Sequence, residues 1–363
     1  MIFRLPSLAK IDTLVRIAHG KRCPEGIVCM AGKPKVLVTR RIPAAGLDRI
    51  LQQCDTELWP DQMPPSYDLL KQKVAGCDGL VSLLTDRIDA VLMDAAPRLK
   101  VVSNYAVGFN NVDVAAATAR GIVVGNTPGV LTDATADMAF CLLIAAARRL
   151  VESVQYAQAG HWRTWEPMGH LGQDLAGRTL GIVGMGRIGY ALARGCHFGW
   201  NMQILYHDMY PNEKAETELD ARSVDLDTLL RQSDFVSVHT DLNEATRGLF
   251  NAESFKKMKQ TAVFVNTARG PIVVEKDLVQ ALKTGVIFAA GLDVTDPEPP
   301  LRSSELLHLP NLIVAPHIAS ATVGTRNAMA EICANNLLAG LRGEPLPAWV
   351  NPEVKDKRRA RIT

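Results

Sequence analysis

Residues 180–189 read Leu-Gly-Ile-Val-Gly-Met-Gly-Arg-Ile-Gly, and this stretch is the strongest structural signal in the chain. Gly184, Gly186 and Gly189 form the pattern G-x-G-x-x-G directly after an apolar run that is typical of a buried strand. In this pattern the first glycine permits a tight turn, the second lets the backbone approach a pyrophosphate, and the third lets the following helix pack closely on the strand. The N-terminus of that helix offers free N–H groups to phosphates. The stretch therefore predicts a dinucleotide-binding loop.

The end of the next apolar run bears on the choice of nucleotide. Asp208 follows the run 203–206 and can accept hydrogen bonds from the ribose hydroxyls. The same carboxylate repels a 2′-phosphate, no Arg adjoins it, and the nearest following cation is Lys214. We therefore predict NAD as the cofactor, with NADH preferred and NADPH as the alternative.

Short apolar runs alternate with longer helical patterns on both sides of this loop, which indicates parallel sheets covered by helices. The predicted strands are 35–38, 79–83, 101–103, 122–124, 179–183, 203–206, 235–239, 262–266, 289–293 and 312–315. The predicted helices include 44–53, 67–74, 133–158 with Thr132 or Asp133 as its cap, and 328–342. We expect an α/β fold with two Rossmann-like domains, each a doubly wound parallel sheet.

Composition excludes several classes of protein. The chain is 47% hydrophobic and 21% charged with a net charge of +2, which is ordinary for a globular enzyme and argues against nucleic-acid or membrane partners. The apolar stretch 138–147 is too short to span a bilayer. The 7 cysteines are odd in number and form no C-x-x-C pair, which favours reduced thiols in a cytoplasmic protein without a metal site.

Both ends of the chain differ from the rest. Residues 1–29 are basic but lack a long apolar core, so we interpret them as a loose extension rather than a targeting peptide. Residues 353–363 form a basic tail that we expect to be solvated.

Three polar segments follow predicted strands at their carboxyl ends, where open α/β sheets bind ligands. They carry Arg269, Glu298 and His317. A protonated His317 can donate to a carbonyl oxygen that accepts a hydride, and Glu298 can orient the ring and favour its charged form. Arg269 can hold a carboxylate, so the three residues suit the reduction of a 2-oxo acid. Asp293 either binds the nicotinamide amide or caps a turn.

These residues, and the segments that contain them, resemble the D-isomer-specific 2-hydroxyacid dehydrogenases, and most closely their glyoxylate/hydroxypyruvate reductase branch. The matching segments are 104–113, 126–137, 184–189, 266–270, 291–299, 316–320 and 335–345. The resemblance covers about residues 35–352 and implies reduction of glyoxylate and hydroxypyruvate to glycolate and D-glycerate. It implies Arg269, Glu298 and His317 as the catalytic residues.

The resemblance also implies the binding residues. Those for the cofactor are Gly184, Met185, Gly186, Arg187, Ile188, Gly189, Asp208, Asp241, Thr267, Ala268, Asp293, His317 and Ala319. Those for the substrate are Leu83, the backbone amides of Val107 and Gly108, Arg269, His317 and Ser320, with Leu84 beside Leu83 as a pocket wall and Trp165 supplied by a partner subunit. A homodimer follows from this role of Trp165. The family further implies a discontinuous substrate domain, 30–130 and 323–352, which closes on the dinucleotide-binding domain, 131–322, by a hinge.

Alternatives remain open at this point. The pocket walls could suit a D-lactate type of dehydrogenase or a short phosphoglycerate type, although Leu83 and Leu84 offer no charge for a substrate phosphate. A nucleotide-sensing, corepressor-like binding protein can share the fold and keep the same residues, and only turnover separates it from an enzyme.

Overall fold

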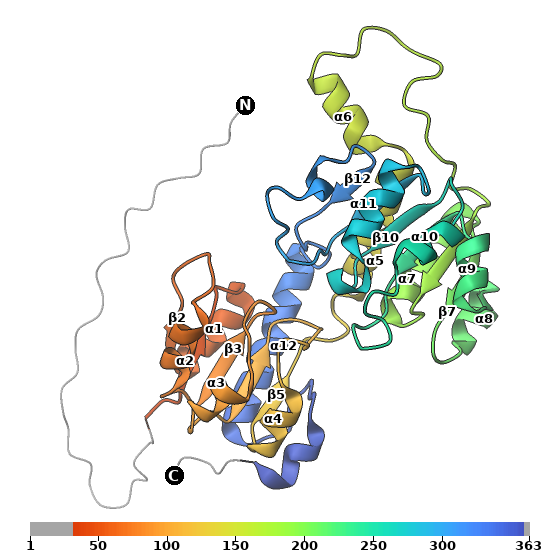
Figure 1. Cartoon of the computed structure of the whole chain (residues 1–363). Helices are drawn as coiled ribbons and strands as arrows, with labels where there is room; N and C mark the ends of the chain where they lie inside the picture. The colour runs from red at the N-terminus through yellow and green to blue at the C-terminus, as the bar shows by residue number, and fades with distance from the viewer. Residues whose placement is uncertain (1–31, 359–363) are drawn as a thin grey trace, which may run out of the picture. The chain divides into compact units, whose positions relative to one another are not determined.

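The structure, a computed structural model, describes residues 32–358, so the predicted extension 1–29 lies outside the described residues. The described chain contains two sheets in which all neighbouring strands are parallel (Figure 1). Parallel strands need crossover connections, and helices supply them here. The predicted α/β class with two parallel sheets is confirmed.

The first sheet has the strand order β2-β1-β3-β4-β5. Its strands are β1 Lys35–Val38, β2 Asp55–Leu58, β3 Gly79–Ser82, β4 Val101–Asn104 and β5 Val123–Gly125. The helices between them are α1 Ala44–Gln53, α2 Tyr67–Val74, α3 Ala90–Asp94 and α4 Val114–Ala119. Helix α12, Val323–Arg342, comes from the far end of the chain and packs against α1 and β4 (Figure 1). A helix from the far end of the chain thus packs on the first sheet. The discontinuous substrate domain and its limits stay a prediction.

The second sheet has the order β12-β11-β10-β9-β6-β7-β8. Its strands are β6 Thr179–Val183, β7 Gln203–His207, β8 Arg222–Ser223, β9 Phe235–Val238, β10 Val263–Asn266, β11 Ala289–Leu292 and β12 Leu312–Val314. The chain builds outward from β6 in one direction and from β9 in the other. This reversal is the switch point of a doubly wound sheet, the place where such folds bind nucleotides.

Helices cover both faces of the second sheet. They are α5 Thr132–Ala147, α7 Arg187–Trp200, α8 Glu213–Leu219, α9 Leu226–Gln232, α10 Ala252–Lys257 and α11 Glu275–Lys283, with short 3-10 helices η1 Gly270–Ile272 and η2 Glu305–His308. Val263 and Val265 of β10 join the core under α5 and α7, whereas Phe264 joins the core under α10 and α11. Successive side chains of a strand point to opposite faces, so the strand is buried on both sides and reads as continuously apolar.

One predicted helix is wrong. The pattern 133–158 predicted a single helix, but the structure ends α5 at Ala147 and starts α6, Leu150–Gln158, after a break. Arg149 lies in the left-handed region with φ 51°, which no helix continues through, and its guanidinium binds Glu152 with Nη2–Oε1 2.6 Å. The predicted N-cap, Thr132 or Asp133, is also wrong, because the residue at the cap position of α5 is Leu131, which makes no side-chain hydrogen bond there.

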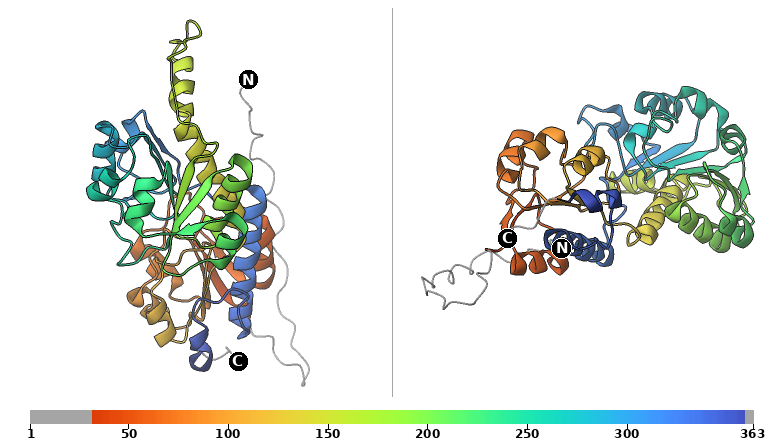
Figure 2. Two further views of the ribbon diagram at one scale, coloured as in Figure 1. Left: turned by 90° about the vertical axis from the view of Figure 1, so that its right-hand side faces the viewer. Right: turned by 90° about the horizontal axis from the view of Figure 1, so that it is seen from below.

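Helix α6 and the segment after it form a projection, which we name the arm, residues 150–172. No residue of α6 is buried, and two views show the arm extending away from the second sheet (Figures 1 and 2). An amphipathic pattern therefore predicted the helix correctly but not its separation from α5.

Two further differences concern polar residues. Strands β2 and β8 were not predicted, because both are edge strands with exposed polar side chains and no apolar run. At the C-terminal end, residues 352–357 form the 3-10 helix η3, Pro352–Lys357, in which Val354 is buried. The side chains of Glu353, Lys355 and Lys357 are exposed, as expected of a basic tail, and residues 359–363 lie outside the described residues.

Candidate active site

The three predicted catalytic residues lie at one edge of the second sheet. Arg269 follows β10, Glu298 follows β11 and His317 follows β12, and these strands are neighbours in the sheet. Parallel strands end at the same edge, so residues far apart in the chain are brought together there.

His317 and Glu298 form a direct pair. The distance from His317 Nδ1 to Glu298 Oε1 is 2.5 Å, and the exposed fractions of the two side chains are 25% and 35%. A carboxylate only accepts hydrogen bonds, so Nδ1 is the donor and Nε2 is left for a ligand. This arrangement is the one expected of a general acid oriented by a carboxylate.

The backbone of His317 is held in an uncommon conformation. Its φ is 53°, in the left-handed region, and the buried Asp293 carboxylate accepts hydrogen bonds from the N–H groups of Ile318 and Ala319, both at 2.8 Å. The carbonyl of Asp293 accepts a further bond from the N–H of His317 at 3.0 Å. Such a conformation persists only where its surroundings over-determine it.

Asp293 therefore has the turn-capping role in this structure. Burial raises the pKa of its carboxyl, and the two N–H donors act in the opposite direction. Of the two roles left open by the sequence, the geometry supplies the cap, and contact with a nicotinamide amide stays a prediction.

Arg269 lies against the loop that follows β4. A side chain built on Gly108 would begin 1.6 Å from Arg269 Nη2, so any side chain at this position would have to displace the guanidinium. The guanidinium also donates from Nε to Asn110 Oδ1 at 3.3 Å and from Nη1 to the carbonyl of Ala268 at 2.6 Å. The structure thus brings together two predicted substrate residues, Arg269 and Gly108, from opposite sheets.

Two acidic residues, Glu298 and Asp241, act on the charge of Arg269. Burial lowers the pKa of its guanidinium, while the negative charges of Glu298 and Asp241 raise it. An arginine stays protonated under these opposing influences, so the site keeps a fixed positive charge beside the His317–Glu298 pair.

The glycine loop has the shape that a dinucleotide needs. Gly184 has φ +96° and a side chain there would begin 2.6 Å from Thr240 N, while one on Gly189 would begin 2.2 Å from the carbonyl oxygen of Gly184. Gly186 differs, since a side chain there would meet nothing within 4 Å. The protein's own packing requires the first and third glycines, and the second borders open space at the N-terminus of α7, where phosphates bind.

Asp208 is tied to this loop. Its Oδ2 accepts from Met185 N at 2.7 Å and its Oδ1 accepts from Tyr210 N at 3.3 Å. The carboxylate therefore borders the glycine loop at the end of β7, and its contact with a ribose stays a prediction.

Several other predicted residues border the same edge. Thr267, Ala319 and Ser320 are buried, Ala268 and Ile188 are half-buried, and Arg187 and Asp241 are exposed. Thr267 Oγ1 and His239 Nδ1 are both buried, and neither has a hydrogen-bond partner among residues 32–358. Orphaned polar atoms at this edge of the sheet fit a polar ligand that would satisfy them.

His239 directly follows β9, at the same edge of the sheet as the candidate site. Its Nε2 lies 2.9 Å from Ser237 Oγ, and burial lowers its pKa to about 3. The ring is therefore neutral at physiological pH and belongs to the wall of the site rather than to its acid–base chemistry.

Trp165 is not brought to the other residues. It lies in the arm with an exposed fraction of 81%, so within one chain it takes no part in the site. Sequence reasoning also missed Asn110, which binds Arg269. Its only signal was its place in a polar run after β4, which does not indicate a partner in the other sheet.

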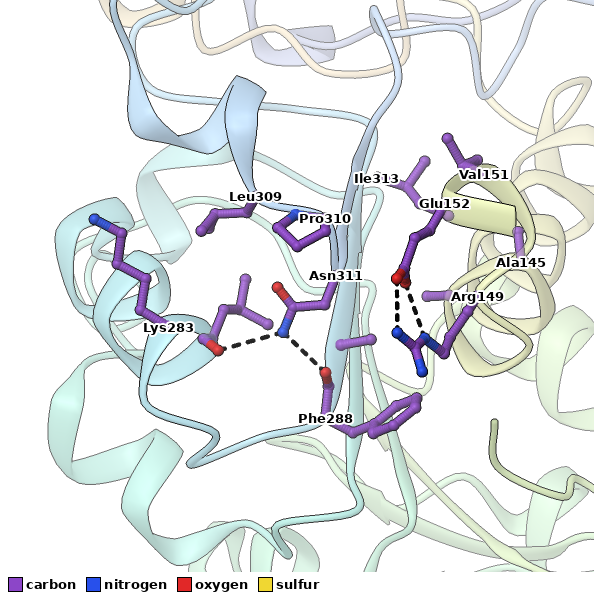
Figure 3. A pocket seen from close by; sticks show the side chains of 13 residues that line it. Ala145, Arg149, Val151, Glu152, Lys283, Phe288, Leu309, Pro310, Asn311 and Ile313 are labelled. Carbon is purple, nitrogen blue, oxygen red and sulfur yellow. Dashed lines mark hydrogen bonds and ion pairs between the residues drawn. The ribbon is translucent and has the colours of Figure 1, made fainter. Parts of the chain in front are cut away.

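The pocket in Figure 3 is a different feature. It has a volume of about 490 Å³ and is lined by residues of α5, α6, α11 and the chain around the starts of β11 and β12, among them Arg149, Glu152, Phe288 and Asn311 (Figure 3). It therefore lies at the amino ends of the strands, the edge opposite His317, and none of the predicted site residues lines it. Since open α/β sheets bind ligands at the carboxyl ends, the candidate site is at the other edge.

A doubly wound sheet with a glycine cradle, and a carboxylate-oriented histidine beside an arginine, define a nicotinamide-dependent oxidoreductase. Comparisons with known proteins agree. The family described as D-isomer specific 2-hydroxyacid dehydrogenase, NAD binding domain, matches residues 140–319. This chain belongs to the D-isomer specific 2-hydroxyacid dehydrogenase family.

Individual relatives match nearly the whole chain. A glyoxylate reductase of Korarchaeum cryptofilum is 52% identical over 323 residues, which are 89% of this chain and 97% of the relative. The crystal structure of the TT0316 protein of Thermus thermophilus has a TM-score of 0.82 and 45% identity, covering 87% of this chain and 99% of that one. An NADPH-dependent glyoxylate/hydroxypyruvate reductase of Sinorhizobium meliloti, solved with NADP and malonate, has a TM-score of 0.78 and 33% identity, covering 91% of this chain and 100% of that one.

Proposed function

We propose that this chain reduces glyoxylate and hydroxypyruvate to glycolate and D-glycerate with a reduced nicotinamide dinucleotide. The observation that carries the proposal is the His317–Glu298 pair beside Arg269, which itself lies against Gly108. The names of the relatives support the same substrate class, since they are glyoxylate reductases and a glyoxylate/hydroxypyruvate reductase.

His317 is the proposed proton donor. A nicotinamide held at this site would supply a hydride for the carbonyl carbon, and the carbonyl oxygen would then need one proton to become a hydroxyl. His317 donates that proton from Nε2, because Nδ1 is engaged by Glu298. Glu298 orients the ring and balances its positive charge, and the left-handed turn fixed by Asp293 sets the position of the ring.

Arg269 and the loop after β4 would bind the substrate carboxylate. A guanidinium and the backbone N–H groups of Val107 and Gly108 together replace the water that a carboxylate loses on binding. Leu83 and Leu84, after β3, would wall a pocket for a small substrate, and Ser320 would border it. Arg269 also attracts electron density toward the carboxylate end, which favours attack on the adjacent carbonyl.

The proposed cofactor contacts are at the switch point. They comprise the predicted residues Gly184, Met185, Gly186, Arg187, Ile188, Gly189, Asp208, Asp241, Thr267, Ala268, Asp293, His317 and Ala319. NADH is preferred over NADPH in this proposal, because Asp208 would repel a 2′-phosphate. Lys214 offers little compensation, since its Nζ lies 4.0 Å from Glu218 Oε1 and 4.6 Å from the ring centre of Tyr190.

We further propose a homodimer in which the arm covers a second copy of the chain. Trp162, Trp165 and Met168 are exposed on the arm, and no residue of α6 is buried. Apolar side chains exposed together mark an interaction surface. Trp165 would then reach the substrate site of the partner. Sedimentation analysis of the purified chain tests the dimer.

A cytoplasmic location is also proposed. Among the described residues, the cysteines at positions 54, 77, 141, 196 and 333 are free thiols, which suits a reducing compartment. Among the described residues no helix is long and apolar enough to cross a membrane. Fractionation of cells that express the protein tests the location.

The test of the function is a kinetic panel. Purified protein is mixed with NADH or NADPH and with glyoxylate, hydroxypyruvate, pyruvate or phosphohydroxypyruvate, and the nucleotide absorbance is followed. The proposal expects the highest kcat/KM for glyoxylate or hydroxypyruvate. A preference for pyruvate or for the phosphorylated acid would contradict it, and tight NADH binding without turnover of any acid would favour a nucleotide sensor.

A further inference from the structure

The loop after β4 has its carbonyl oxygens anchored one after another. The carbonyl of Ala106 accepts from Thr127 N at 2.9 Å, that of Val107 accepts from Asn126 Nδ2 at 2.8 Å, and that of Gly108 accepts from Asn104 Nδ2 at 2.9 Å. Two of the three donors are side-chain amides, so the arrangement depends on particular residues and not on backbone pairing alone.

Anchored carbonyls determine where the N–H groups point. In a trans peptide the C=O and the following N–H lie in one plane and point in opposite directions. The bonds to Thr127, Asn126 and Asn104 therefore turn the N–H groups of Val107, Gly108 and Phe109 away from those partners. Within residues 32–358, none of these three N–H groups donates to another protein atom. Arg269 Nη2 lies at the position that a side chain of Gly108 would take, so the free donors are next to a guanidinium.

The Asn104 amide is itself held in place. It is fully buried, and its Oδ1 accepts from Ser82 Oγ at 3.0 Å and from Asn111 Nδ2 at 3.3 Å. Asn111 Nδ2 also donates to the carbonyl of Leu83 at 3.0 Å. Asn104 and Asn111 therefore join the loop after β4 to the pocket wall after β3.

The backbone of Asn126 is held by helix α12. The residue has an exposed fraction of 9%, and its backbone carbonyl accepts from Asn336 Nδ2 of α12 at 2.8 Å. Asn336 Oδ1 in turn accepts from Ala348 N at 3.0 Å. The C-terminal helix thus supports the residue that anchors Val107.

We propose that Asn104 and Asn126 are positioning residues for the substrate carboxylate, which hold the carbonyls of Gly108 and Val107 so that the adjoining N–H groups stay presented beside Arg269. The inference rests on the proposed function. An asparagine is required because its amide donates, whereas an aspartate of the same size would place a negative oxygen against a carbonyl oxygen. A carboxylate is bound alike before and during hydride transfer, so loss of the anchor should raise KM far more than it lowers kcat.

The experiment compares Asn126→Asp and Asn104→Asp with a matched control, Asn351→Asp. Asn351 is equally buried beside the same sheet and its amide also donates to a backbone carbonyl, that of Ile122 at 3.0 Å, but it does not touch the loop. The readouts are KM and kcat for glyoxylate, the Kd of NADH, and the Kd of oxalate for the NADH complex measured by nucleotide fluorescence. Thermal denaturation reports whether each variant is folded.

We expect at least a ~10-fold rise in the glyoxylate KM and in the oxalate Kd for both loop variants, the effect of one lost hydrogen bond and an unpaired buried carbonyl. Their kcat should change by less than about 3-fold, and their NADH Kd should be unchanged, because the glycine loop belongs to the other sheet. If Asn126→Asp does not fold, Asn126→Ser carries the test, since it removes the reach to Val107 without adding a charge.

Wild-type oxalate affinity in folded loop variants would overturn the inference. An equal loss of oxalate affinity in Asn351→Asp would also overturn it, because the effect would then be a general consequence of a buried charge. Failure of the wild-type protein to bind oxalate or to reduce any 2-oxo acid, despite NADH binding, would instead overturn the proposed function.

Discussion

The two loop edges that form the candidate site are built from different kinds of residue. The edge of β10, β11 and β12 carries charged side chains, namely Arg269, Glu298 and His317. The edge of β3 and β4 carries neutral amides, Asn104 and Asn111, which bind backbone carbonyls. Groups that exchange protons or hold charge therefore come from the nucleotide-binding sheet, while the other sheet contributes fixed backbone geometry.

The largest effect in a test of this division should come from removing the general acid, His317. His317→Ala should lower kcat by at least ~100-fold, the low end of what a positioned general acid contributes. The matched control is His308→Ala, an exposed histidine of η2 on the same part of the chain. Steady-state kinetics with NADH and glyoxylate decide the matter, and near-normal turnover of the first variant would refute the assignment of His317.

The contact between the two edges gives the next largest effect. Gly108→Ala should reduce kcat/KM by about 30-fold, because the new methyl group would begin 1.6 Å from Arg269 Nη2 and must displace the guanidinium. Gly76→Ala is the control, since a side chain there meets nothing within 4 Å. Equal kinetics of the two variants would mean that Arg269 does not act next to this loop.

The nucleotide preference depends on the second sheet alone, through Asp208 after β7. Asp208→Ser should shift the ratio of kcat/KM for NADPH to that for NADH upward by about 10-fold, because a repelling carboxylate is removed from the ribose position. Asp174→Ser, an exposed acid before β6 at the opposite edge, should leave the ratio unchanged. An unaltered ratio in Asp208→Ser would remove the electrostatic argument for NADH.

The smallest effect concerns pH and stability. The folded pKa of His239 is about 3, below its ordinary value, so the unfolded chain binds a proton that the folded chain rejects. Its contribution to stability is complete above pH ~6.5 and is lost as the pH falls toward the folded pKa, with a loss of no more than about 2 kcal/mol by pH ~5. The melting temperature of the wild type should therefore fall more steeply between these pH values than that of His239→Gln. Parallel melting curves for the two proteins would show that His239 titrates normally in the folded state.

Sequence periodicity predicted the elements that have a clear apolar pattern. Strands β1 and β6 and helices α1 and α2 have the bounds expected from their apolar patterns, because burial selects the same residue types wherever it occurs. The polar edge strands β2 and β8 escaped prediction, since an edge strand needs no apolar run. The break at Arg149 escaped it too, because one residue in the left-handed region leaves no periodic signal.

Local residue patterns were enough to identify the nucleotide cradle and the three charged residues, because each depends on residue types at short spacing next to a strand. How distant segments meet became known only from the folded chain. Folding places the guanidinium of Arg269 against Gly108 and lets the Asp293 carboxylate cap the turn at His317. It also lets Asn336 bind the backbone of Asn126, more than two hundred residues away in the chain. These contacts are geometric matches between separate elements, and no local pattern encodes which distant partner a buried amide or carboxylate will find.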